Sequence, residues 1–134
     1  MNRPKLVSVL KILGVWVPTV LFGALFVMQG IMKLQPASPW PEMFEGWGYP
    51  AGSHRLVGLL ELLGGILLFV PRLSGYAAVM LATVMLGACL THLAHAETTG
   101  TITTFVIGSV LAVLARVRLP RRRSRAHLAH SDPA

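Results

Sequence analysis

The chain has 134 residues, of which 54% are hydrophobic and only 13% are charged, and its mean hydropathy is +0.64. A soluble domain carries about 25% charged residues, so this composition excludes an ordinary soluble fold and favours a membrane protein. The net charge of +7 does not indicate nucleic-acid binding, because half of the twelve basic residues lie between Arg116 and Arg125, where they flank an apolar run. A single cysteine, Cys89, excludes a disulfide or a CxxC redox pair within the chain.

The first predicted element is a transmembrane helix over about residues 12–32, an uncharged apolar run that follows a basic leader. Its length suits a hydrocarbon core of about 30 Å. A signal peptide is the alternative, but the run is too long and ends in MQGIMK rather than at a small-residue cleavage site. Gln29 and Lys33 lie four residues apart near its far end and therefore share one helix face.

The longest loop, residues 33–55, is rich in proline, glycine and aromatic residues and contains no transmembrane run. Pro41 is suited to the first turn of a short helix over residues 42–45. Because tryptophan and tyrosine favour the membrane–water boundary, one interpretation is an interfacial plug anchored by aromatic side chains. The other interpretation is a lid over a pocket that opens to this side of the membrane.

Three further transmembrane helices are predicted over about residues 54–70, 73–94 and 101–117, joined by a tight PRLSG turn and a short AETTGT connection. Residues 120–134 are basic and lack an apolar pattern, which predicts a disordered cytosolic tail. The sequence thus predicts an all-α polytopic membrane protein, an antiparallel four-helix transmembrane bundle within residues 1–119.

The distribution of basic residues predicts the orientation of this bundle. All twelve except Lys33 and Arg55 fall on the side that holds both termini and the PRLSG turn. The positive-inside rule places that side in the cytosol. We therefore expect a protein of the cytoplasmic (plasma, or bacterial inner) membrane with both termini cytosolic and the aromatic loop facing outward.

Glu61 is a single carboxylate within an otherwise apolar helix. Burying an ionisable group there costs about 2.5–3.5 kcal/mol on insertion scales, so Glu61 is expected to face the bundle interior and to have a partner. The partner interaction is either a structural link between two helices or part of a site for a substrate, proton or cofactor. Gly58 and Gly65 lie seven residues apart on the same face and would let another helix approach closely.

An antiparallel bundle brings the outer helix ends together, so Lys33, Glu61 and His92 are predicted to meet in one pocket roofed by the segment from Trp47 to Pro50. Lys33 as a snorkelling anchor and His92 as a hydrogen-bonded helix end are the alternatives, although histidine is also the usual proton shuttle near neutral pH. The ligand-binding candidates are Lys33, Glu61, His92, Gln29, Trp47 and Tyr49, and the structural candidates are Gly58, Gly65 and Pro50. No catalytic residue is assigned.

Metal cofactors are not predicted. His92 and His95 are three residues apart on one helix and are poorly placed to ligate opposite faces of one haem, while His54 lies in a loop. Clustered Cys and His residues at zinc spacings are absent from the sequence.

The segments GIMKL, F-x-x-W-G-Y-P, VGLLELLGGILLFVPRLSGYAA and MLGACLTHL occur in this order between about Phe26 and Val117. Together they resemble the DoxX-like family of small membrane proteins. The resemblance implies a four-helix transmembrane bundle and, for some members, thiosulfate:quinone oxidoreduction or membrane-associated redox and thiol-stress complexes. Related eukaryotic proteins resemble assembly chaperones or cargo receptors. The motif positions that match are Lys33, Gly48, Pro50, Glu61 and His92, and no catalytic role comes with them.

Two functional hypotheses follow. The first is an accessory subunit of a membrane redox system, more an accessory than an enzyme on its own, with a quinone or another small amphipathic molecule in the outward pocket and a partner redox protein. The lack of a cysteine pair argues against disulfide exchange. The second is a non-catalytic membrane scaffold or assembly partner for another membrane protein, or a homo-oligomer. Both place the chain in the lipid bilayer and neither involves nucleic acid.

Overall fold

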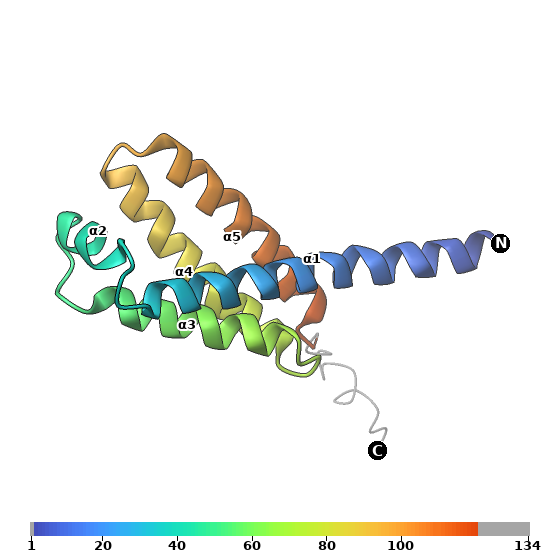
Figure 1. Ribbon diagram of the computed structural model, residues 1–134. Helices are drawn as coiled ribbons and strands as arrows, with labels where there is room; N and C mark the ends of the chain where they lie inside the picture. Colours follow the sequence, from blue (N-terminus) through green and yellow to red (C-terminus); the bar gives the residue numbers. More distant parts are fainter. Residues whose placement is uncertain (1, 121–134) are drawn as a thin grey trace, which may run out of the picture.

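The computed structural model describes residues 2–120, and within this range every regular element is an α-helix (Figure 1). The helices are α1 (Arg3–Leu34), α2 (Trp40–Gly46), α3 (Ser53–Leu68), α4 (Ser74–Ala94) and α5 (Thr98–Arg118). The all-α prediction is confirmed for these residues. The predicted tail lies, apart from Pro120, outside the described residues.

The fifth helix, α2, lies inside the predicted longest loop, where a short helix was expected over residues 42–45, and it extends that expectation to Trp40–Gly46. This helix has a proline at its start, where the missing N–H costs no hydrogen bond. The first helix also differs from its prediction, since α1 begins at Arg3 rather than near Ile12. Basic residues end an apolar span but do not end a helix, and Pro4 fits the first helical turn.

Three helices, α1, α4 and α5, are long and apolar enough to cross a membrane. With 16 residues, α3 has a length of about 24 Å at 1.5 Å per residue, which is short of a core of about 30 Å. Large apolar side chains point away from the protein along these helices; Leu21 is 64% exposed and Phe105 is 66% exposed. A surface of this kind suits hydrocarbon rather than water.

The helices pack as two hairpins, α1 with α3 and α4 with α5, which are joined where α3 meets α4. Glycines form the α1–α3 seam. A Cβ atom added to Gly30 would lie 2.6 Å from the carbonyl oxygen of Gly58, and one added to Gly65 would lie 2.9 Å from that of Gly23. Gly23 and Gly30 are seven residues apart on α1, and Gly58 and Gly65 are seven residues apart on α3. The two backbones therefore stay in contact over two turns of each helix.

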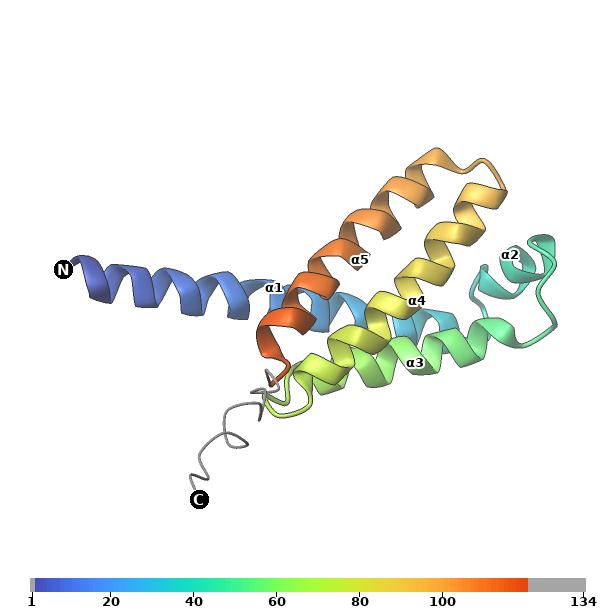
Figure 2. The same cartoon turned by 180° about the vertical axis from the view of Figure 1, so that it is seen from behind.

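The hairpins converge at one end of the molecule and diverge toward α2 at the other (Figures 1 and 2). The hydrophobic core lies at and beside the converging end and consists of Phe26, Leu68, Ala77, Ala78, Leu81, Met85, Leu111, Leu114 and Ala115. There the Arg118 guanidinium donates to Thr19 Oγ1 at 2.9 Å and to Ser74 Oγ at 3.0 Å. We call this the closed end, and the end covered by α2 the open end.

Candidate functional site

A cavity of about 580 Å³ lies between the two hairpins at the open end. Its walls come from α1, α3, α4 and α5, and α2 with the following segment covers it. All six predicted ligand-binding candidates line this cavity: Gln29, Lys33, Trp47, Tyr49, Glu61 and His92. The remaining lining is mostly apolar, with threonines on α4 and α5. An apolar cavity with a few converging polar groups is the usual form of a small-molecule site.

The most buried polar contact of the cavity is the ion pair between Lys33 on α1 and Glu61 on α3. Lys33 Nζ lies 2.8 Å from Glu61 Oε2, and the two residues are only 5% and 3% exposed. The ammonium also lies 4.0 Å from the centre of the Trp40 ring, in cation–π geometry. The pair sits where the glycine seam brings α1 and α3 closest, since an added Cβ on Gly58 would meet Lys33 Cβ at 2.8 Å.

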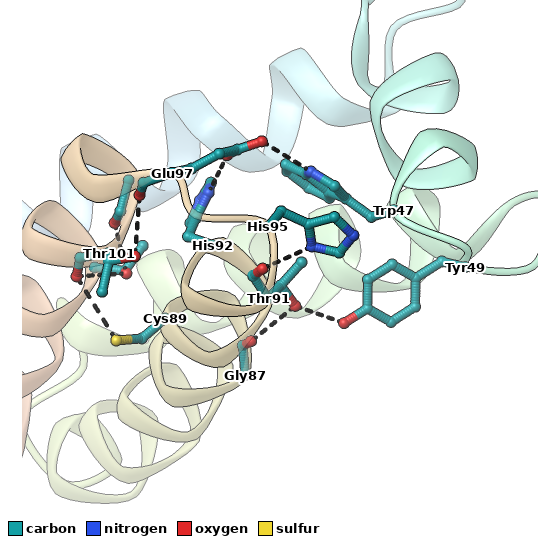
Figure 3. A network of polar contacts seen from close by, with 11 residues as sticks. Trp47, Tyr49, Gly87, Cys89, Thr91, His92, His95, Glu97 and Thr101 are labelled. Atoms are coloured by element: carbon teal, nitrogen blue, oxygen red, sulfur yellow. Dashed lines mark hydrogen bonds and ion pairs between the residues drawn. The ribbon is translucent and has the colours of Figure 1, made fainter.

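A second polar group lies on the opposite hairpin, where α4 turns into α5 (Figure 3). His92 Nδ1 lies 2.6 Å from Glu97 Oε2, and the Trp47 indole donates to Glu97 Oε1 at 3.1 Å. The hydrogen bonds from His92 and Trp47 hold the pKa of Glu97 below its usual value. A carboxylate on one ring nitrogen fixes the orientation of the imidazole and leaves Nε2 as the nitrogen for a ligand.

The segment from Trp40 to Pro50, which we call the aromatic lid, is fastened to both hairpins. Phe44 is buried at its centre and contacts the rings of Trp47, Tyr49 and His54, the last of which belongs to α3. On the other side, Tyr49 Oη and Thr91 Oγ1 lie 2.6 Å apart (Figure 3). Together with the Trp47–Glu97 bond, this contact holds the lid across the open end of the cavity.

The structure does not bring the predicted residues into one contact network. His92 bonds to Glu97 and not to the Lys33–Glu61 pair, so the cavity has two separate polar walls. Gln29 lines the cavity without a side-chain hydrogen bond within residues 2–120. Pro50 does not line it, and its carbonyl accepts a hydrogen bond from Ser53.

Sequence reasoning missed Glu97 and Thr91 as members of the site. The spacing of His92 and Glu97, five residues apart across a short turn, was a usable signal, because a helix end followed by a turn can bring such residues together. Ala96, between the helices, has a φ of 57°, which turns the chain so that the Glu97 N–H donates to the His92 carbonyl at 2.9 Å. A non-glycine residue in this conformation is uncommon and gives no clear sequence signal.

Among the described residues no group of three or more His, Cys, Asp or Glu side chains is placed to hold a metal ion. Cys89 lies outside the cavity, in a second groove between α4 and α5, where its thiol donates to the Thr101 carbonyl. The prediction that His54 lies in a loop is wrong, because α3 begins at Ser53 and includes it. His54 is buried against Phe44, and within residues 2–120 its Nδ1 has no hydrogen-bond partner.

Comparison with known proteins identifies the family. The model of the DoxX-like family matches residues 17–115, and the chain belongs to this family, which confirms the resemblance. The chain is also 27% identical over 79 residues to a Bacillus subtilis (strain 168) protein named "Putative oxidoreductase CatD". That alignment covers 59% of each chain, so less than two thirds of the relative's length is matched. No solved structure matches the chain.

Proposed function

We propose that this member of the DoxX-like family is an accessory subunit of a membrane redox system, and that its cavity binds a small amphipathic molecule, with a quinone as the leading candidate. The observation that carries the proposal is a cavity of about 580 Å³ with apolar walls and a buried Lys33–Glu61 ion pair. Pockets that bind small molecules typically have volumes of roughly 300–1,000 Å³, and this cavity falls within that range. The redox part is supported by the name of the Bacillus subtilis relative.

The polar groups of the cavity suit a head group that accepts hydrogen bonds. An ammonium has three N–H donors, and the acceptor that Lys33 has within residues 2–120 is Glu61. The remaining donors are available to a carbonyl oxygen of a ligand. His92, held by Glu97 on the other hairpin, would contact a second oxygen, and an imidazole paired with a carboxylate suits proton exchange near neutral pH.

The same proposal places the chain in the cytoplasmic membrane as a four-helix bundle with both termini in the cytosol. The distribution of basic residues supports this orientation, because the only lysines and arginines at the open end within residues 2–120 are Lys33 and Arg55. The short α3 would span a locally thinned bilayer while packed against α1 and α4. Labelling of Arg72→Cys in a Cys89→Ser background, by a thiol reagent that cannot cross the membrane, tests the topology: labelling of intact cells contradicts it.

The binding part is tested with decylubiquinone and the purified protein in lipid nanodiscs. The double variant Lys33→Met/Glu61→Gln removes both charges, so neither is left buried without a partner. We expect its affinity for decylubiquinone to fall at least about tenfold, which corresponds to one lost hydrogen bond from a charged donor. Lys33→Arg, which keeps a cation beside Glu61, is the matched control. Wild-type affinity in the double variant contradicts the binding proposal.

The scaffold hypothesis keeps a specific observation in its favour. A second groove of about 480 Å³ runs between α4 and α5 on the outside of the bundle and contains the small residues Ala82, Gly108 and Ala112. Small residues let a helix of another membrane protein or of a second copy approach closely. Crosslinking in native membranes tests this. The scaffold is favoured if Ala112→Leu loses a crosslinked partner and neither the wild type nor the variant binds decylubiquinone.

A further inference from the structure

Gly87 has no packing role within the described chain. It lies in α4, lines the cavity and is exposed, and a Cβ atom added to it meets no atom within 4 Å. In contrast, Gly64 on α3 packs so tightly that an added Cβ would lie 2.6 Å from Leu81. A glycine costs a helix about 1 kcal/mol relative to alanine, so its position beside open space calls for another reason.

The open space beside Gly87 belongs to a window between α3 and α4. Toward the closed end, the contact of Gly64 with Leu81 closes the gap between the helices. Toward the open end, the Tyr49–Thr91 hydrogen bond joins the aromatic lid to α4. From Leu81 to Thr91 the window extends along α4 for about 15 Å at 1.5 Å per residue. Figure 2 shows α4 diverging from α3 toward α2 over this stretch.

The residues beside this window are apolar and lie where the protein would contact lipid tails. Leu56 and Val57 on α3 and Val84 on α4 line the cavity at this level, and Leu56 is 63% exposed. The aqueous end of the cavity, in contrast, is covered by the aromatic lid and its bonds to Glu97 and Thr91. A ligand therefore meets fewer fixed contacts when it comes from the bilayer than when it comes from water.

We propose that the ligand is a membrane-dissolved amphiphile that enters sideways through the α3–α4 window, with its head at Lys33 and His92 and its tail lying over Gly87 into the bilayer. This inference rests on the proposed ligand-binding function and names the class of ligand and its route. A prenyl quinone and a membrane lipid share this chemistry, an oxygen-bearing head and a long apolar tail. Mass spectrometry of molecules extracted from the purified protein distinguishes the two sources.

The experiment measures the binding of two ubiquinones that share one head group, decylubiquinone and ubiquinone with a single isoprene unit. Both are followed in nanodiscs by equilibrium dialysis, with the bound ubiquinone measured by its absorbance, so that an added tryptophan does not alter the readout. The variants are Gly87→Ala, Gly87→Leu and Gly87→Trp, which fill the window by increasing amounts. Leu90→Trp is the matched control, because Leu90 is exposed on α4 and lines neither the cavity nor the second groove.

We expect Gly87→Leu and Gly87→Trp to weaken decylubiquinone about tenfold, the loss given by about two displaced methylene contacts. Gly87→Ala should cause the smallest loss of the three, Leu90→Trp should stay close to wild type, and the short-tailed ubiquinone should be nearly unaffected in every variant. Unchanged decylubiquinone binding in Gly87→Trp, or an equal loss for both ubiquinones, overturns the tail route while leaving the binding function intact. Wild-type protein that binds neither ubiquinone overturns the binding function, and the tail route with it.

Discussion

The closed end and the open end of the bundle both join helices through charged side chains, but with opposite results. At the closed end, Arg118 bonds to the neutral hydroxyls of Thr19 and Ser74 beside a packed apolar core. At the open end, Lys33 and His92 are each paired with a carboxylate, and a cavity separates the pairs. One end is filled and the other is hollow, although the same helices build both.

This difference indicates what the charges at the open end are for. A buried ion pair is a weak source of stability, because the cost of removing two charges from solvent roughly offsets their attraction. Apolar residues at these two positions would hold α1 against α3 equally well. The position of the charged pair beside a cavity therefore supports the proposed binding role, whereas Arg118 joins α5 to α1 and α4.

The largest loss of stability is expected when one charge of the open end is left without its partner. Lys33→Met is expected to lower the free energy of unfolding by about 3–5 kcal/mol, because it leaves Glu61 buried without a cation. Adding Glu61→Gln should recover most of that loss. Thermal unfolding of the single and double variants in the same detergent checks this. Equal stability of the two variants would mean that Glu61 loses its charge without cost.

The glycine seam holds α1 against α3 between the two ends, and a larger side chain at one of its glycines disrupts this contact. Gly30→Leu is expected to cost about 3 kcal/mol, the upper end of overpacking costs, because the new side chain meets backbone atoms of α3 that cannot move aside. The yield of monodisperse protein and its thermal unfolding measure the loss. Gly14→Leu is the matched control, since an added Cβ there meets nothing within 4 Å. Equal losses in both variants would point to a general effect of leucine in α1.

The closed end should respond more mildly. Arg118→Met removes two charge-assisted hydrogen bonds but leaves no charge unpaired, so we expect a loss of about 2 kcal/mol and unchanged decylubiquinone affinity. The neighbouring Arg116 is exposed, and Arg116→Met should stay within about 0.5 kcal/mol of wild type. A large loss of ligand affinity in Arg118→Met, with the fold retained, would mean that the two ends are coupled.

The features that were predictable from the sequence are those that follow from helical periodicity. A carboxylate in an apolar helix requires a partner, and in an antiparallel hairpin the end of the first helix supplies Lys33. The spacing of Gly58 and Gly65 likewise indicated a close helix contact, and the structure places α1 there. Such inferences need only a helix, its facing residues and the order of the elements.

The features that were not predictable depend on how the connecting segments fold and how the hairpins tilt. The Thr19–Arg118 bond joins residues 99 positions apart, and the angle between the hairpins decides whether they meet. The contact between Trp47 and Glu97 requires both the short helix α2 and the unusual turn at Ala96. Each of these geometries is set by tertiary packing rather than by local sequence pattern.

The smallest expected effect concerns the bond that holds the aromatic lid to the open end. Hydrogen bonds from His92 and Trp47 lower the pKa of Glu97 from its usual 4.5, so their stabilising contribution is present above that value and is lost as the pH falls through the lowered pKa. In a Trp16→Phe/Trp40→Phe background, Trp47 fluorescence should therefore change with a midpoint below pH 4.5. Glu97→Gln should abolish this change, because the amide does not titrate, while thermal unfolding stays near that of the background protein. A transition that persists in Glu97→Gln would assign the lid's pH response to another group. At the closed end, the hydrogen bonds of Arg118 within residues 2–120 go to hydroxyls, so no such transition is expected there.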